Sequence, residues 1–328
     1  MKKFMVVGCG KIAGAEGVSL ITHASAINST PGAKLVACVD INHGKAKKFA
    51  KLYGCRPYQN LEKAIDENRV DVISICTPDN THYKIAKKII TSPRRPSIIF
   101  LEKPVCRTII EYEELCDLAS RYKVVIAVNT TRRVSKKYEE LKKFFTENKF
   151  GEISQIKVTY YSGWYHNGWH AIDLLCFLFG NTINWDKVDS IIPSPYPNDP
   201  TIEITGHFVR KGSKIDISSI DESLFQLFEV DVWCEKGRVK LEDFGNKITF
   251  EKRIINDIGE HVLTPFKYNI PTSKKPEIEI MVSKICNYLE NKDIDGLKAI
   301  LIGSFRLTFT ILWEGEKLSQ KEEILAVG

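Results

Sequence analysis

The sequence has no apolar run long enough to cross a bilayer, and no long stretch of one charge sign. The apolar stretch at residues 4–7 is too short for a signal peptide, and a glycine loop follows it instead of a cleavage site. The net charge of +6 is mild for 328 residues, and lysines alternate with acids in stretches such as 136–143, which is typical of a solvated helix face. We therefore expect neither a membrane nor nucleic acid as a partner.

The cysteines form no pattern that would indicate a disulfide framework or a zinc site. There are nine of them, with no Cys-x-x-Cys pair and no cysteine–histidine cluster at zinc spacing. Cys38 and Cys76 fall inside predicted strands, where a free cysteine acts as a small hydrophobe. This distribution favours a reducing, cytoplasmic setting, and we expect no bound metal.

Strands alternate with helices over residues 1–128. Apolar runs predict strands at residues 4–7, 35–39, 70–76, 98–101 and 124–128. The stretches between them predict helices at residues 44–53, 61–67, 82–90 and 109–121. Such alternation implies βαβ units, so we expect an α/β domain of the Rossmann type, with a doubly wound parallel sheet, over residues 1–128.

Residues 129–328 have a different pattern, and the chain is long enough for a second core. A helix at 136–147 is followed by a strand at 155–161 and an apolar helix at 170–179. Successive strands with short turns then predict an antiparallel sheet, and helices at 276–291 and 297–316 close the chain. We expect an α+β substrate domain over residues 129–328, with the closing helices packed back on the first domain.

The first predicted strand leads into a dinucleotide-binding signature, Gly-x-Gly-x-x-Ala. Gly8 permits the turn, Gly10 lets the backbone approach a pyrophosphate, and Ala13 allows close helix packing. We expect a helix to start in this loop and to present free N–H groups to the phosphates, with Lys11 and Ile12 also at the cofactor.

Asp40 ends the second predicted strand, where an acid can bind the adenosine ribose hydroxyls. The alternative role for Asp40 is that of a helix N-cap. The next residues, Ile41-Asn42-His43, offer no arginine for a 2′-phosphate, so NAD is favoured over NADP.

Lys103 lies at the end of the fourth predicted strand, where open parallel sheets bind ligands. Its ammonium should face a ligand, although an ion pair with Glu102 or Asp173 is an alternative. Pro104 fixes the backbone after it. His82 is either a ligand contact or a histidine packed at a helix start.

Two further groups are candidates for the substrate. Asn129 and Arg132-Arg133 follow the fifth strand, and arginines there can bind a carboxylate or phosphate or remain in solvent. The aromatic segment from Tyr160 to Trp169, which includes Trp164, can stack on a sugar ring or pack at a domain interface.

Five motifs occur in a fixed order along the chain: Gly8-x-Gly10-x-x-Ala13, Asp40, Thr77-Pro78-x-x-x-His82, Glu102-Lys103-Pro104 and Gly168-Trp169-His170-Ala171-Ile172-Asp173-Leu174-Leu175. In this order they resemble the glucose–fructose oxidoreductase / inositol dehydrogenase / rhizopine-catabolism (Gfo/Idh/MocA) family of NAD(P)-dependent oxidoreductases. The resemblance covers essentially the whole chain. The resemblance implies a second domain with an open, mostly antiparallel sheet, which often forms a homodimer or homotetramer interface in such proteins.

The resemblance also implies roles for single residues. Lys103 would lie beside the nicotinamide and the substrate hydroxyl, and the catalytic histidine would map to His170, with the acid three residues on at Asp173. Family members commonly have aspartate four residues before that histidine, where this chain has His166. Since both histidines can face the substrate, which of them is the acid/base stays open. No Glu follows His166, so a zincin-type metal pair is not expected.

The residues expected at each site can be stated together. The expected cofactor contacts are Gly8, Gly10, Lys11, Ile12, Asp40, Thr77, Pro78, His82, Glu102 and Lys103. The expected catalytic residues are Lys103, His170, His166 and Asp173. The expected substrate contacts are Lys103, Asn129, Arg132, Trp164, His166 and Asp173.

The expected activity is that of an NAD-dependent dehydrogenase or ketoreductase acting on CH–OH groups of a sugar or sugar nucleotide. An inositol or polyol dehydrogenase is the alternative enzyme. A non-catalytic NAD-binding regulator on the same fold is a second class, and retention of Lys103 and His170 argues against it. A methyltransferase would have no reason to carry the Glu102-Lys103-Pro104 motif.

Overall fold

The computed structural model describes residues 1–15, 22–210 and 212–327, without the side chains of residues 323–327. These residues divide into two compact units. The first contains Met1–Lys136 and Ser273–Arg306, and the second contains Lys137–Thr272 and Leu307–Gly328. The chain therefore leaves the first unit at residue 136 instead of at the predicted boundary of 128, and it returns for residues 273–306.

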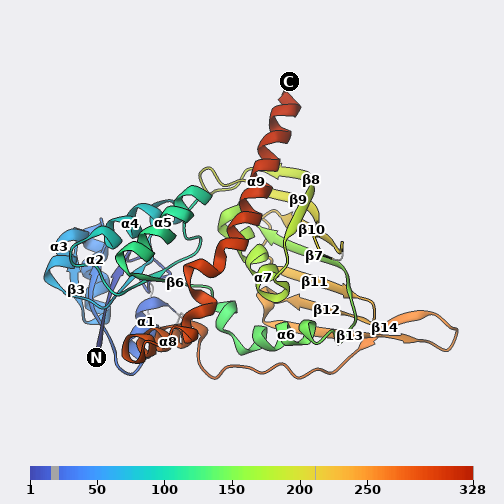
Figure 1. Ribbon diagram of the computed structural model, residues 1–328, viewed down its shortest axis with the longest axis horizontal. Coiled ribbons are helices and arrows are strands. Elements are labelled where there is room, and N and C mark those ends of the chain that lie inside the picture. The colour runs from blue at the N-terminus through green and yellow to red at the C-terminus, as the bar shows by residue number, and fades with distance from the viewer. Residues whose placement is uncertain (16–21, 211, 328) are drawn as a thin grey trace. The chain divides into compact units, whose positions relative to one another are not determined.

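The first unit is built on a parallel sheet (Figure 1). Its strands are β1 (Lys2–Val7), β2 (Ala33–Val39), β3 (Arg56–Tyr58), β4 (Val72–Ile75), β5 (Ile98–Leu101) and β6 (Val125–Val128). They lie in the order β3-β2-β1-β4-β5-β6, with all pairs parallel. Every residue of β4 and β5 is buried, as expected of strands covered on both faces. This order is that of a dinucleotide-binding sheet, which confirms the predicted Rossmann fold.

Side-chain caps set the start of several helices in the first unit. Thr22, Asn42, Asn60 and Thr108 each accept a hydrogen bond from a backbone N–H three residues later. The helices are α1 (His23–Ser29), α2 (His43–Tyr53), α3 (Leu61–Glu67), α4 (His82–Thr91), α5 (Ile109–Tyr122) and α8 (Glu277–Asn291). Since Asn42 caps α2, the alternative role of Asp40 as an N-cap is wrong.

The segment after the glycine loop differs from the prediction of an immediate helix. Residues 11–15 form turns in which the N–H groups of Gly14 and Ala15 donate to the carbonyl of Gly10. Among the described residues, the first helix is α1, which begins at His23. Glycine at position 14 has a φ of +125°, which does not continue a helix. The expected helix start at the glycine loop is therefore wrong, and residues 16–21 lie outside the described part.

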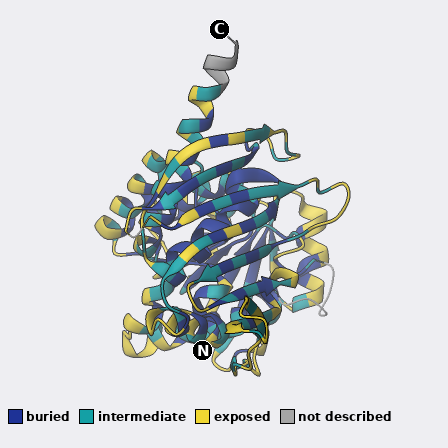
Figure 2. Cartoon of the chain, turned by 90° about the vertical axis from the view of Figure 1, so that its right-hand side faces the viewer, coloured by how far each residue is buried: buried dark blue, intermediate teal, exposed yellow. Residues whose placement is uncertain are grey.

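The second unit is built on a mostly antiparallel sheet, as predicted. Its strands are β7 (Ile153–Tyr161), β8 (Ile183–Ile192), β9 (Thr201–Phe208), β10 (Lys214–Ile220), β11 (Glu229–Cys234), β12 (Gly237–Glu242), β13 (Lys247–Ile255) and β14 (His261–Pro265). Their order is β14-β13-β12-β11-β7-β10-β9-β8, and β7 pairs with β10 in parallel. Buried and less buried residues alternate along strands such as β9 and β12 (Figure 2), because one face of the sheet packs on the core.

Helices of the second unit pack on the buried face of this sheet. They are α6 (Lys136–Thr146), the π-helix η3 (Gly163–Gly168), α7 (Trp169–Phe179) and α9 (Arg306–Val327). The predicted closing helix at 297–316 is wrong at its start. Two 3₁₀ segments, η5 (Asp295–Ile300) and η6 (Ile302–Phe305), precede α9, because Leu301 is extended and forms a β-bridge with Ala127.

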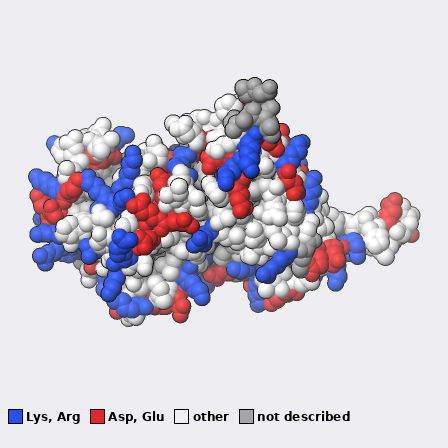
Figure 3. Space-filling model, turned by 45° about the horizontal axis from the view of Figure 1, so that its top comes forward, with Lys and Arg blue, Asp and Glu red and all other residues white. Residues whose placement is uncertain are grey.

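No helix in the described ranges has the length and apolar character that a membrane span needs. Basic and acidic side chains lie interspersed on the face shown in Figure 3, without a broad field of one sign.

Candidate active site

The glycine loop joins β1 to the turn that follows it. Gly8 has a φ of +89°, and a Cβ built on it would lie 2.7 Å from the carbonyl oxygen of Cys76 at the end of β4. Only glycine fits there. A Cβ built on Gly10 would have no atom of the described residues within 4 Å, so none of these residues covers the backbone at Gly10. This arrangement fits a pyrophosphate lying against the loop.

Asp40 is tied to the glycine loop. Its Oδ2 accepts from the N–H of Cys9 at 2.9 Å, and its Oδ1 accepts from the N–H of Asn42 at 2.8 Å. Each carboxylate oxygen has a second lone pair that can accept from a ribose hydroxyl. The next residue, Ile41, is 89% exposed, and no cation stands among residues 41–42. A carboxylate that can accept from ribose hydroxyls, with no cation beside it for a 2′-phosphate, fits NAD.

The ring of His82 connects the ends of two neighbouring strands. Its Nδ1 lies 2.7 Å from the carbonyl oxygen of Pro104, and its Nε2 lies 2.8 Å from that of Thr77. The ring is buried, and burial lowers its pKa more than the two carbonyls and the nearby Glu102 and Asp79 raise it. With both nitrogens facing carbonyls, His82 connects the two loops, which favours the alternative of a histidine packed at a helix start, and the cofactor contact stays a prediction.

Glu102 points into the interior of the first unit. Its Oε1 accepts from Nε2 of His23 at 2.7 Å and from Nδ2 of Asn129 at 2.5 Å. Burial alone would raise the pKa of Glu102, but His23, Asn129 and the charge of Lys103 outweigh it and hold the pKa below its ordinary value. Glu102 and Asn129 therefore anchor each other, and their predicted contacts with the cofactor and the substrate stay predictions. Lys103 itself is half-buried.

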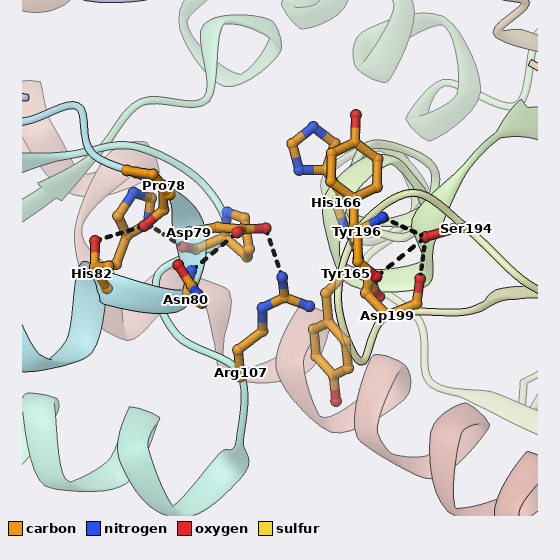
Figure 4. Close-up of polar contacts among 12 residues, drawn as sticks. Pro78, Asp79, Asn80, His82, Arg107, Tyr165, His166, Ser194, Tyr196 and Asp199 are labelled. Atoms are coloured by element: carbon orange, nitrogen blue, oxygen red, sulfur yellow. Dashed lines mark hydrogen bonds and ion pairs between the residues drawn. The ribbon is translucent and has the colours of Figure 1, made fainter. Parts of the chain in front are cut away.

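An ion pair that the sequence did not predict joins the loops after β4 and β5, the same two loops that His82 connects. Arg107 donates to Oδ2 of Asp79 at 2.9 Å, and both side chains are mostly buried (Figure 4). Asp79 follows β4 and Arg107 follows β5. The two residues are 28 positions apart, so no local pattern indicates the pairing.

The two arginines after β6 have different surroundings. Arg133 is buried, donates to the carbonyls of Ala299 and Ser304, and stacks on the ring of Phe305 at 4.0 Å. It is a structural residue. Arg132 is half-exposed, so of the pair it is the one that can reach a ligand.

The predicted substrate contact of Trp164 is wrong. Its side chain is 1% exposed, and its indole N–H donates to the carbonyl of Leu312 in α9 at 2.8 Å. The rings of Tyr160 and Trp185 pack on it edge-on. All of these partners belong to the second unit, so Trp164 is part of its core.

His166 lies on the π-helix η3 and is held by a loop that sequence reasoning did not single out. The ring of Tyr196 stacks on the His166 ring, with centroids 3.7 Å apart and planes 18° apart (Figure 4). Asp199 from the same loop accepts from the N–H groups of Tyr165 and His166 at 2.8 and 2.9 Å. The signal in the sequence is weak, since only the aspartate and the tyrosine between prolines mark this loop.

His170 and Asp173 lie on α7, three residues apart. His170 is half-buried, and the ring of Phe228 meets it edge-on at 6.5 Å. Asp173 is buried and accepts from Oγ1 of Thr308 on α9 at 3.2 Å. Asp173 thus links α7 to α9, which indicates a positioning role for this acid.

The structure groups the predicted residues within each unit. In the first unit, the glycine loop meets Asp40, and the ends of β4, β5 and β6 are tied through His82, Glu102 and Asn129. Lys11, Ile12 and Pro78 are exposed at the same loops. In the second unit, His166, His170 and Asp173 follow one another on η3 and α7.

Comparison with known proteins gives a consistent family. Residues 2–130 match the model of the oxidoreductase family with an NAD-binding Rossmann fold, GFO_IDH_MocA. Glucose-6-phosphate 3-dehydrogenase of Bacillus subtilis (strain 168) is 28% identical over 158 residues, 48% of this chain and 42% of that protein. The scyllo-inositol 2-dehydrogenase (NAD(+)) of the same organism is 26% identical over 159 residues, again 48% and 42%. Both alignments thus span less than half of the relative's length.

A solved structure shares the whole fold. The WlbA dehydrogenase from Bordetella pertussis, in complex with NADH and UDP-GlcNAcA, has a TM-score of 0.74 to this chain and covers 97% of it and 96% of its own length. The two sequences are 16% identical, so this likeness concerns the fold.

Proposed function

We propose that this chain is a member of the Gfo/Idh/MocA family of oxidoreductases, whose NAD-binding model matches residues 2–130, and that it transfers a hydride between NAD and a secondary alcohol or ketone of a carbohydrate. The proposed substrate is a sugar or a sugar nucleotide. The observation that carries the proposal is that the glycine loop, Asp40 and Lys103 follow β1, β2 and β5 of one parallel sheet. Ligands of open parallel sheets bind at that edge.

The first unit would hold NAD through its backbone and one acid. NAD, when bound, takes up or supplies the hydride. The uncovered backbone at Gly10 would face the pyrophosphate, and Asp40 would accept hydrogen bonds from the adenosine ribose. The absence of an arginine from residues 41–43 favours NAD over NADP.

The protein must also handle a proton, because oxidation of an alcohol releases one from oxygen. Lys103 would donate to the substrate oxygen and stabilise the negative charge that develops on it. His170 would accept the proton, since the ordinary pKa of histidine lies near neutrality. His166 is the alternative acid/base, and its stacking on Tyr196 would fix the direction of its ring.

Two features would recognise the carbohydrate. The stacked pair His166–Tyr196 offers an aromatic surface of the kind on which sugar rings pack, and Arg132 offers a guanidinium for a phosphate or carboxylate. The name of the glucose-6-phosphate relative makes a phosphorylated hexose one of the substrates to test.

An inositol or polyol dehydrogenase is the second candidate. The similarity to the scyllo-inositol 2-dehydrogenase of Bacillus subtilis favours it. Inositols and sugars both present secondary alcohols, so the same lysine and histidine would serve either substrate.

The test is the absorbance of NADH at saturating NAD with UDP-sugars, free hexoses, hexose phosphates, uronic acids and inositols. We expect NADH formation with one of these classes, and its loss in Lys103→Ala. NAD binding without turnover of any compound, in either direction, would contradict the proposal and favour a non-catalytic regulator.

The proposed assembly is a homodimer or homotetramer through the sheet of the second unit. One face of that sheet keeps half-buried polar residues, among them Asp231, Arg238 and Glu251, which form ion pairs with one another. Light scattering after size-exclusion chromatography would measure the number of subunits. We expect fewer subunits in an Arg238→Glu variant, because it reverses the charge at the centre of these ion pairs.

A further inference from the structure

The tripeptide Glu102-Lys103-Pro104 is anchored on both sides of the lysine. Before it, the carboxylate of Glu102 accepts from His23 and Asn129. After it, the carbonyl oxygen of Pro104 lies 2.7 Å from Nδ1 of His82. All three contacts lie within the first unit. The backbone that carries Lys103 is therefore fixed by its two neighbours.

The anchor on the Glu102 side is buried and charged. His23 is 0% exposed and Asn129 is 8% exposed. His23 opens α1 and Asn129 follows β6, so the carboxylate ties two distant segments to the end of β5. The His23 ring also packs against Phe100 of β5, with centroids 4.6 Å apart. A buried carboxylate that loses a donor becomes costly, so this anchor holds the loop tightly.

The anchor on the Pro104 side ties the loop to the end of β4. The second nitrogen of His82 lies 2.8 Å from the carbonyl oxygen of Thr77. The ion pair between Asp79 and Arg107 joins the same two loops at 2.9 Å. These contacts therefore fasten the end of β4 to the end of β5.

We propose that His23 and His82 are positioning residues, which hold Lys103 at the cofactor and substrate by fixing Glu102 and Pro104 on either side of it. Neither ring touches the substrate, and each acts through the backbone of the tripeptide. This inference rests on the proposed function of Lys103. A displacement of about 1 Å at a reacting group can lower a rate by about 10²-fold. A loosened loop would therefore have a larger effect on kcat than on the affinity for NAD.

Steady-state kinetics of matched variants test the proposal. His23→Leu and His82→Phe keep the bulk of each side chain and remove its hydrogen bonds, while His23→Gln retains an N–H donor for Glu102. We expect kcat to fall at least tenfold in the first two, with the KM for NAD changed less than threefold, and to recover in part in His23→Gln. Tyr112→Phe is the control, because it removes a buried hydrogen bond of the same unit, to the carbonyl of Ile302. It should retain its kcat.

A second readout separates this proposal from the proposed activity and from simple misfolding. Pyridoxal phosphate followed by borohydride labels accessible lysines, and peptide mass spectrometry reports the labelling of Lys103. We expect NAD to protect Lys103 in the wild type and to protect it far less in His23→Leu and His82→Phe that still bind NAD. Such a result would support the positioning role even if no substrate is turned over. Unchanged protection, or unchanged kcat in both variants, would overturn it.

Discussion

At the scale of single residues, burial separates the groups that can act on a ligand from those that hold the fold. Arg132 and Arg133 are neighbours of the same type, yet Arg133 is buried against Phe305 and two carbonyls. Trp164 and His166 are two positions apart, yet only His166 is more than a few per cent exposed. A residue's type therefore says less about its role than the side of the element on which it lies.

Gly10→Ala should weaken NAD binding without weakening the fold. The added Cβ meets no atom within 4 Å in the part of the chain that the structure describes, but it fills the space that a pyrophosphate needs. We expect the Kd for NAD, measured by titration calorimetry, to rise at least tenfold, with the Tm unchanged.

Two glycines serve as comparisons for that variant. Gly303, in the same unit, has equally open space around a built Cβ, so Gly303→Ala should leave both Kd and Tm unchanged. Gly8→Ala should lower the Tm as well, because its Cβ would collide with the backbone of Cys76. Normal NAD affinity in Gly10→Ala would contradict the assignment of this loop to the phosphates.

At the scale of elements, local signals predicted most of the first unit. Residues 98–101 and 61–67 form β5 and α3 within the predicted bounds, because an apolar run and an amphipathic stretch with an asparagine cap are local signals. The displaced start of α1 and the extended Leu301 depend on contacts with other segments, which periodicity does not report.

Much of the candidate site could not be predicted for the same reason. His23 and Glu102 are 79 residues apart, and His166 meets a tyrosine 30 positions away in a loop without a motif. The sequence predicted Lys103, His166, His170 and Asp173 as site residues, but it did not predict which residues contact them. The roles of these four residues stay predictions.

Stability should depend on pH through His82. Burial holds its pKa below the ordinary value of 6.5, so the unfolded chain binds this proton at a higher pH than the folded protein does. Below about pH 6.5, down to the folded pKa, the unfolded state binds more protons, and the free energy of unfolding falls as the pH falls. Above about pH 6.5, His82 is neutral in both the folded and the unfolded state, so its protonation no longer lowers the free energy of unfolding.

Urea unfolding of the wild type and His82→Phe between about pH 5 and 8 measures this dependence. The variant should be less stable throughout, by roughly 1–3 kcal/mol for the buried carbonyl that loses the single N–H donor of the neutral ring. Its free energy of unfolding should fall less steeply below about pH 6.5 than that of the wild type. Parallel curves would show that His82 is not the titrating group.

The loop that carries Tyr196 and Asp199 should control the substrate and not the cofactor. Tyr196→Ala removes the ring that stacks on His166, whereas Tyr196→Phe keeps it. We expect the KM for the carbohydrate to rise about tenfold in the alanine variant, with the KM for NAD unchanged, and little change in the phenylalanine variant. Equal effects of both variants would exclude stacking as the reason.

At the scale of the whole molecule, the chain builds two cores and passes between them more than once. Residues 273–306 return to the first unit, and α9 then belongs to the second from Leu307 onward. The glycine loop, Asp40 and Lys103 follow strands of the parallel sheet, and η3 and α7 of the second unit carry His166 and His170. The proposed reaction needs groups from both, so activity should require the full chain.

The most direct test of this account compares Lys103→Ala with the wild type on the carbohydrate that forms NADH fastest. We predict that kcat falls by about 10²-fold or more, as expected when a group that stabilises charge in the transition state is lost, while the Kd for NAD changes less than threefold. A kcat near that of the wild type, with NAD bound normally, would contradict the central role of Lys103.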